Sequence, residues 1–418
     1  MFSFKLSNFS KITCSSIVHY AKILDTFLIP SCTPFTALKQ FVFLSDASYT
    51  QCLTWDRKTW LPDVTPLRKL KAFISLSVLL LVNNHVLFYI LTNEVVGYHK
   101  DPELTLAATL LLVIALSLAI CAFIASQIYA FKGKTVCFIY RNVETLRQIC
   151  QPEIGIPLRR INPIGLFLNL CVTLVLLFPL VCVTAPFLGL FAGNAAMDPG
   201  YFLTRSLTFI PPIGLLVLRM MINFFGSLHI SIVLLGLVII LANVAISVTV
   251  CLDWLFGENK GPEGFTMLKK LTRFRKELTV YRQLEIVFRE ANDTLYYLLP
   301  IVGLTFFVSA VLLSYLVIKL HATVPLLIMF LSGTVIIFIG AILHFMLPLV
   351  SEILARSEAL LRLWKLGATS RSGGWTKQVR SCCRLRLYVG PFFYIETNTR
   401  TGLMGLIFYY TASLLISA

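Results

Sequence analysis

Seven long apolar blocks, each with few charged residues, limit what this chain can fold into. A run of about 18 or more apolar residues can cross the hydrocarbon of a bilayer as a helix. Only helices and closed barrels satisfy their backbone hydrogen bonds there, and the period-2 alternation of a barrel is absent. We therefore expect an all-α, polytopic bundle of seven transmembrane helices. The blocks cover residues 70–92, 104–131, 163–191, 222–256, 295–318, 324–350 and 402–416.

Two stretches make the number of spans less simple. The last block is short, so it spans only if it begins near Thr397 or if the bilayer thins around it. The weaker stretch 207–218 contains Pro211 and Pro212 and is followed by Arg219. We interpret this stretch as an interfacial or re-entrant segment, the alternative being an eighth span.

The basic residues fix the expected orientation. Four segments, 1–71, 132–162, 257–294 and 352–401, hold 32 of the 36 Lys and Arg residues. Lysine and arginine are retained on the cytoplasmic side of a membrane, so these segments and the N-terminus are expected inside and the C-terminus outside. The net charge of +16 is thereby explained by topology, and no nucleic-acid partner is expected. Membrane lipid is the expected surrounding.

The blocks divide the chain into six parts. The expected parts are a cytoplasmic N-terminal segment (1–69), transmembrane helices 1 to 4 (70–256), a cytoplasmic amphipathic anchor helix (257–294), transmembrane helices 5 and 6 (295–351), a basic cytoplasmic segment (352–401) and transmembrane helix 7 (402–418).

Between the fourth and fifth blocks, apolar residues recur every three or four positions, which predicts one apolar face of a helix. Such a face packs on a neighbouring helix or lies on the membrane surface. We favour packing, because the helix would continue into span five and project from the bilayer. The segment 352–366 extends span six in the same way, so we expect cytoplasmic helical extensions of spans 4 to 7 that anchor subunits together. The apolar positions are Met267, Leu271, Phe274, Leu278, Tyr281, Leu284, Phe288 and Ala291.

The residues of catalysis are not grouped in this sequence. Asp253 is the one acidic residue within the seven blocks, and His85, His229 and His344 have no partner nearby in the sequence. An enzyme needs titratable groups that converge, and an ion-coupled carrier usually needs intramembrane carboxylates. We expect no enzyme activity, no cofactor and no metal site.

The outer halves of several spans carry aromatic residues with scattered hydroxyls, which suits a small apolar or amphipathic ligand between helices. Ordinary helix packing is the alternative explanation for each of these residues. The candidate ligand-binding residues are Phe178, Thr184, Phe187, Phe225, His229 and Phe330, with Phe191, Phe224 and Ser332 as further positions.

The last third of the chain carries a family resemblance. The approach to span five, Leu284 to Leu299 with Asn292, the stretch Leu387 to Ile395 and the final helix Gly402 to Leu415 resemble the insect odorant and gustatory receptor superfamily. In the final helix, Tyr409-Tyr410 stands at the family's Thr-Tyr position, whereas Ile416 and Ser417 replace its Gln-Phe. The chain looks most like a divergent, gustatory-like arthropod member.

The resemblance implies a chemosensory receptor of the plasma membrane that is a ligand-gated, non-selective cation channel. It implies tetramers, with identical or related receptor subunits, around a pore lined by the last helix, and an intracellular anchor. Alternatives are a transporter of small solutes and a membrane protein with a structural or trafficking role. The expected pore-lining residues are Ile407, Tyr410, Thr411, Leu414 and Ser417, with Leu403 on the same face and Leu406, Tyr409 and Ser413 on the next.

Overall fold

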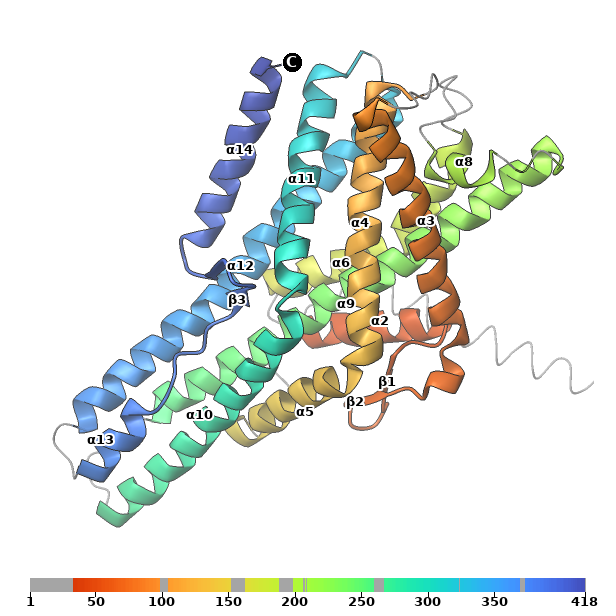
Figure 1. Ribbon diagram of the computed structural model, residues 1–418. Coiled ribbons are helices and arrows are strands. Elements are labelled where there is room, and N and C mark those ends of the chain that lie inside the picture. The colour runs from red at the N-terminus through yellow and green to blue at the C-terminus, as the bar shows by residue number, and fades with distance from the viewer. Residues whose placement is uncertain are drawn as a thin grey trace, which may run out of the picture.

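The computed structural model describes residues 33–97, 104–151, 162–187, 198–205, 207, 209–258, 267–322, 324–368 and 373–417. Over these residues the protein is a helical, multi-pass membrane bundle, as the sequence predicts (Figure 1). Six of the described helices are long and apolar enough to cross a membrane. They are α3 (Lys71–Val96), α4 (Leu106–Phe131), α6 (Pro163–Val183), α9 (Pro212–Glu258), α11 (Leu298–Lys319) and α12 (Leu326–Ala368).

The seventh expected span is helix α14 (Thr399–Ser417), which packs against α11 and α12 and runs beside α11 in Figure 1. Its length suits a span, but α14 does not meet the hydropathy of the other six within the described chain. Arg400 and the paired tyrosines Tyr409 and Tyr410 lower its apolar character. The last block was expected to span only if its helix began near Thr397, and α14 begins two residues later, at Thr399.

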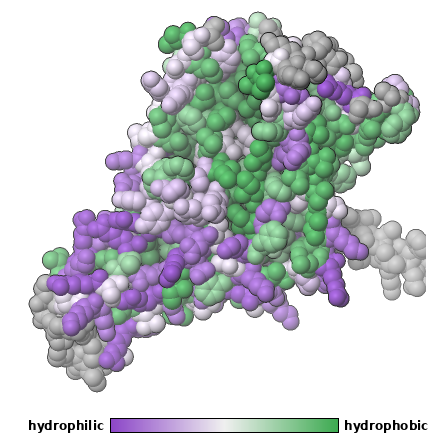
Figure 2. Space-filling view, in the orientation of Figure 1, coloured by the Kyte–Doolittle hydropathy of each residue, from purple (hydrophilic) through white to green (hydrophobic). Residues whose placement is uncertain are grey.

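Two of the helices are longer than a membrane is thick. Helix α9 has 47 residues and α12 has 43, which at about 1.5 Å per residue gives about 70 Å and about 65 Å. The hydrocarbon of a bilayer is about 30 Å thick. These two helices run down to α5 (Gly133–Cys150), α10 (Met267–Leu295) and α13 (Gly373–Arg380), at the lower left of Figure 1. We call this region the polar end, because hydrophilic residues gather on it in Figure 2, whereas hydrophobic residues predominate in the upper part of the view.

The amphipathic stripe of α10 is buried within the chain. Tyr281 and Leu284 are fully buried, and Phe274 packs edge-on against Trp364 of α12, with ring centroids 5.6 Å apart. Tyr281 also contacts Trp364 and donates a hydrogen bond of 2.7 Å to the carbonyl of Cys383. The stripe thus binds α10 to α12 and to the segment after α13; the side chains of Met267 and Leu271 lie outside the described residues.

Helix α2 (Pro34–Ser48) was not expected from the sequence. It packs against α6 and α9, and Ala37, Leu38 and Val42 are fully buried in the main core. Thr33 and Thr36 form a capping box at its start, and Pro34 occupies the first turn. Both features are common at the start of a helix. The expected N-terminal segment 1–69 therefore contains a helix that belongs to the bundle.

A short hairpin follows α2. Strands β1 (Leu53–Trp55) and β2 (Pro62–Val64) pair antiparallel, and the 3-10 helix η1 (Leu67–Lys69) leads into α3. Trp55 packs edge-on against Tyr140 of α5, with ring centroids 4.9 Å apart. The hairpin thereby joins the N-terminal segment to the polar end.

Two expectations about irregular segments were wrong. From Pro212 onward, the stretch 207–218 is not a separate segment but the first part of α9, and proline is favoured in the first turn of a helix. The stretch before α14 is not a helix but a hairpin of β3 (Tyr388–Val389) and β4 (Phe393–Tyr394). Its turn holds Gly390 at a φ of 57° and then Pro391, and neither suits a helix interior. Span seven therefore has no helical extension.

Candidate ligand cavity and helix α14

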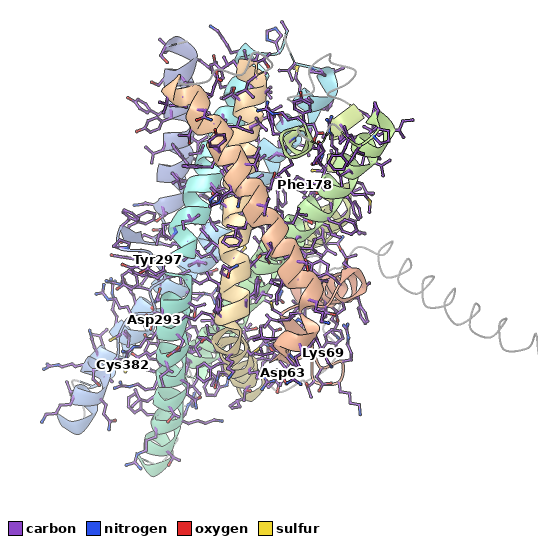
Figure 3. All side chains as sticks on the ribbon, turned by 45° about the vertical axis from the view of Figure 1, so that its right-hand side comes forward. Asp63, Lys69, Phe178, Asp293, Tyr297 and Cys382 are labelled. Atoms are coloured by element: carbon purple, nitrogen blue, oxygen red, sulfur yellow. The ribbon has the colours of Figure 1, made fainter. Side chains whose placement is uncertain are left out.

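A cavity of about 130 Å³ lies between α3, α4, α6 and α9. Phe178, one of its lining residues, lies in the half of the bundle opposite to Lys69, Asp293 and Cys382 (Figure 3). None of the described residues that line the cavity is charged. Its wall consists of Leu79, Leu80, Asn83, Ala115, Leu118, Ala119, Phe178, Cys182, Ala185, Pro199, Ile222, Asn223, Gly226, Ser227 and Ile230.

The shape of this wall follows from small residues at helix positions that face one another. Ala115 and Ala119 lie four apart on α4, and Gly226 lies on α9, so no large side chain fills the space between the helices. A Cβ atom added at Gly226 would meet no other atom within 4 Å. The cavity is close in size to the apolar cavity of about 150 Å³ that holds benzene in an engineered protein.

A buried polar cluster adjoins the cavity next to helix α8 (Pro199–Thr204). Asp198 caps α8, and its Oδ1 accepts hydrogen bonds from the backbone N–H of Gly200 (2.9 Å) and from Nδ2 of Asn223 (2.7 Å). Oδ2 of Asp198 is buried and has no hydrogen-bond partner among the described residues. Burial raises the pKa of the Asp198 carboxyl, while Asn223, Gly200 and the charge of Arg219 act in the opposite direction.

His229 forms a second polar centre within the bundle. It is fully buried, and its Nδ1 lies 2.6 Å from the hydroxyl of Tyr49, in the segment after α2. Its Nε2 lies 3.1 Å from Oγ of both Ser77 and Ser126. Both serine hydroxyls already donate to backbone carbonyls, so Nε2 carries the hydrogen and Nδ1 accepts from Tyr49. One neutral imidazole thereby joins the N-terminal segment to α3, α4 and α9.

The structure separates the predicted ligand-binding residues. Phe178 lines the cavity, whereas His229 lies beside it in its own hydrogen-bonded cluster. Thr184, Phe187 and Phe225 are exposed on the surface of the single chain, and Phe330 is 70% exposed. Phe191 lies outside the described residues. Among the lining residues only Phe178 was predicted, and the polar or small residues Asn83, Asn223 and Gly226 were missed, although the amides were visible as polar breaks in apolar blocks.

Helix α14 shows one packed face and one exposed face. Leu403 and Ile407 pack against a cluster of Ala310, Ile339 and Leu343 from α11 and α12. On the same side of α14, Thr411 is buried and Leu414 is half-buried. Tyr410 contacts Phe307 with ring centroids 5.5 Å apart, and Tyr410 and Ser417 are exposed. The neighbouring face, with Leu406, Tyr409 and Ser413, is exposed in the single chain.

A second hollow lies at the polar end, between α10 and residues 383–390, with a volume of about 420 Å³. Its wall includes the charged residues Glu285, Arg289, Asp293 and Arg386. Such a wall does not suit an apolar ligand. No group of three or more His, Cys, Asp or Glu side chains that could hold a metal ion occurs within the described chain.

Comparison with solved structures gives two matches over most of the chain. The chain is similar to the insect olfactory receptor OR5 from Machilis hrabei in complex with eugenol, with a TM-score of 0.60 and 11% identity, covering 91% of this chain and 98% of that one. It is also similar to the same receptor described without eugenol, with a TM-score of 0.57 and 12% identity, covering 91% and 97%. No protein-family model and no curated protein sequence matches the chain. This likeness shows the fold.

Proposed function

We propose that this chain, which has the fold of an insect olfactory receptor, is a chemosensory receptor of the plasma membrane that opens a cation channel when a small molecule binds. The main support for this proposal is the structural similarity to that receptor over 91% of the chain. The apolar cavity between α3, α4, α6 and α9 supports it, because binding sites for small molecules are mostly apolar clefts or cavities and occur between the helices of bundles.

The proposed ligand site is the cavity lined by Phe178, Asn83 and Gly226. An uncharged wall favours a neutral ligand, because a charge moved from water into such a site is not compensated. The volume of about 130 Å³ suits a molecule of the size of a substituted benzene ring. The match to a receptor solved with eugenol agrees with a small organic ligand.

The proposed pore lies along α14 in a tetramer of identical or related subunits. Ile407 packs on α11 and α12 within the chain, and on the same side Thr411 is buried and Leu414 is half-buried, so this side of the helix is supported by its own subunit. The exposed face with Leu406, Tyr409 and Ser413 is free to line a central axis, with Tyr410 and Ser417 at its edge. Apolar constrictions gate by excluding water, and hydroxyl groups ease the passage of ions.

The polar end is proposed to lie in the cytoplasm and to anchor the subunits. Its basic residues belong to the segments that hold 32 of the 36 Lys and Arg residues, which are retained on the cytoplasmic side. Helices α10 and α12 are tied together there through Trp364, so the anchor is a rigid extension of spans five and six.

The ligand site is tested by Gly226→Ala, with whole-cell currents recorded while small neutral organic compounds are applied. The added methyl group meets no atom in the empty cavity, so folding is expected to be unchanged while ligands that fill the cavity lose affinity. A lost methylene contact corresponds to about 0.8 kcal/mol, or roughly fourfold in concentration.

Gly303→Ala on α11 is the matched control, because a Cβ atom there also meets nothing within 4 Å and Gly303 does not line the cavity. We expect that this variant keeps the wild-type dose–response curve. Equal curves for Gly226→Ala and the wild type, for every active compound, would place the ligand elsewhere.

A further inference from the structure

Few side chains in the cavity wall can form hydrogen bonds. The ligands that they can bind depend on which of their donors and acceptors are already used within the protein. The hydroxyl of Ser227 donates to the backbone carbonyls of Asn223 and Phe224, so its hydrogen is already used. Its oxygen still has room to accept. Toward the cavity, Ser227 is therefore an acceptor of hydrogen bonds.

Asn223 is held in one orientation by the neighbouring carboxylate. Its Nδ2 donates to Oδ1 of Asp198 at 2.7 Å, and Asp198 is itself fixed by the backbone of Gly200. A carboxylate accepts and does not donate, so it selects the amide orientation with nitrogen toward it. The amide oxygen of Asn223 lies beside Gly200 of α8, 3.1 Å from the position that a Cβ atom of Gly200 would take, so this amide is held against α8.

Asn83 supplies the third group. It lines the cavity from α3, and its Oδ1 is buried without a hydrogen-bond partner among the described residues. A buried carbonyl oxygen that lacks a partner costs free energy, which a ligand with a donor recovers on binding.

We propose that the ligand, on the premise that the function above holds, is a compact neutral molecule with one O–H or N–H donor on an apolar ring or chain, such as an alcohol or a phenol. The donor binds the amide oxygen of Asn83, and the apolar part fills the space beside Phe178 and Gly226. Aldehydes, ketones and esters fit less well, because they carry no donor and leave Oδ1 of Asn83 without a partner.

The test compares phenol with toluene, which have equal numbers of heavy atoms and differ in one donor. Each compound is titrated against the purified full chain in detergent, and binding is read from the rise in its thermal unfolding temperature. We expect phenol to bind the wild type at least as tightly as toluene, although toluene is the more apolar. Asn83→Leu is expected to shift the ratio of the two dissociation constants by roughly tenfold toward toluene.

Asn84→Leu is the matched control. Asn84 is the next residue on α3, and its Oδ1 is also buried without a partner among the described residues, but it does not line the cavity. It is expected to leave the phenol-to-toluene ratio unchanged. If Asn83→Leu does not give folded protein, Asn83→Ala removes the same amide without added bulk and carries the test.

The outcomes separate this proposal from the proposed function. If both compounds bind, both lose affinity in Gly226→Ala, and toluene is much preferred in the wild type, the cavity is the ligand site and the donor proposal is wrong. A preference for phenol that survives both Asn83 variants also overturns it. If neither compound binds, or if Gly226→Ala changes nothing, the cavity is not the ligand site and both proposals fail.

Discussion

Gly236 of α9 allows helix α2 to pack closely against α9, because glycine has no side chain. Helix α2 packs across α9 at this point, and a Cβ atom at Gly236 would lie 2.4 Å from Cζ of Phe41. Phe41 is buried in the main core, so its ring has little room to move. The close approach of α2 and α9 therefore depends on glycine here.

Gly236→Ala is expected to destabilise the protein by about 1–3 kcal/mol, because it overpacks a filled core. The thermal unfolding temperature of the purified variant should fall below that of the wild type. Gly303→Ala, which adds the same methyl group where nothing lies within 4 Å, should leave the unfolding temperature unchanged. Equal values for both variants would mean that α2 does not pack against α9 as described.

Asp198 leads to a prediction about pH. Burial raises the pKa of its carboxyl, so the folded protein keeps this proton to a higher pH than the unfolded chain does. The stability that comes from this group is therefore greatest at low pH and is lost as the pH rises through the raised native pKa. Asp198→Asn has no such charge and still offers an oxygen to Asn223 and Gly200.

We expect Asp198→Asn to be at least as stable as the wild type at neutral pH and to reduce the gain in stability on acidification. Thermal unfolding of both proteins at about pH 5 and about pH 7.5 measures this. Asp198→Ala is the control that loses both hydrogen bonds and the helix cap, at a cost of about 1 kcal/mol. A less stable Asp198→Asn at neutral pH would show that the charge itself, beside Arg219, holds the cluster together.

Among the helices, α10 is the one in which the spacing of apolar residues in the sequence agrees best with the face that is buried in the structure. The spacing of Phe274, Tyr281 and Leu284 predicts one buried face, and all three side chains are buried. Leu284→Asp would bury a carboxylate on that face without a partner, at a cost of several kcal/mol. Ile286→Asp, two residues on and 53% exposed, is the matched control.

We expect Leu284→Asp to abolish the folded peak in fluorescence-detected gel filtration, while Ile286→Asp keeps it. If Ile286→Asp instead yields folded protein that no longer forms tetramers, the exposed side of α10 is a contact between subunits. Folded, stable Leu284→Asp protein would contradict the buried stripe and favour a helix on the membrane surface.

Length and hydropathy predict the helices of this fold, because burial in lipid demands both. All seven predicted apolar blocks contain helices of the structure. Helix α2 was missed because its 15 residues are too few for a span and its apolar face is not strongly segregated. The β3–β4 hairpin was missed because its strands have two residues each, too few for an alternating pattern, so that only Gly390-Pro391 signals a turn there.

The candidate site was less predictable than the fold. Aromatic residues such as Phe225 and Phe330 favour a lipid-facing surface as readily as a ligand site, and both are exposed in the single chain. The cavity is made instead by absent side chains at Gly226, Ala115 and Ala119 and by two amides. Such a cavity depends on which helix faces pack together, and the facing residues come from segments far apart in the sequence.

In the whole molecule, the proposed receptor binds its ligand in the bundle, lines its pore with α14 and joins its subunits through the polar end. The bundle and α14 are connected mechanically through α11 and α12, on which Leu403 and Ile407 pack. A ligand can open the pore only if it binds the open arrangement of these helices more tightly than the closed one.

The proposed channel function is tested by purified chain reconstituted into planar lipid bilayers, with current recorded before and after a small neutral ligand is added. We expect ligand-evoked, cation-selective channel currents in the wild type, with a higher ligand concentration required by Gly226→Ala. Cysteine at Leu406, Tyr409 or Ser413 should make these currents sensitive to a charged thiol reagent. Uptake of the ligand into vesicles without any cation current would rule out the channel and identify a transporter instead.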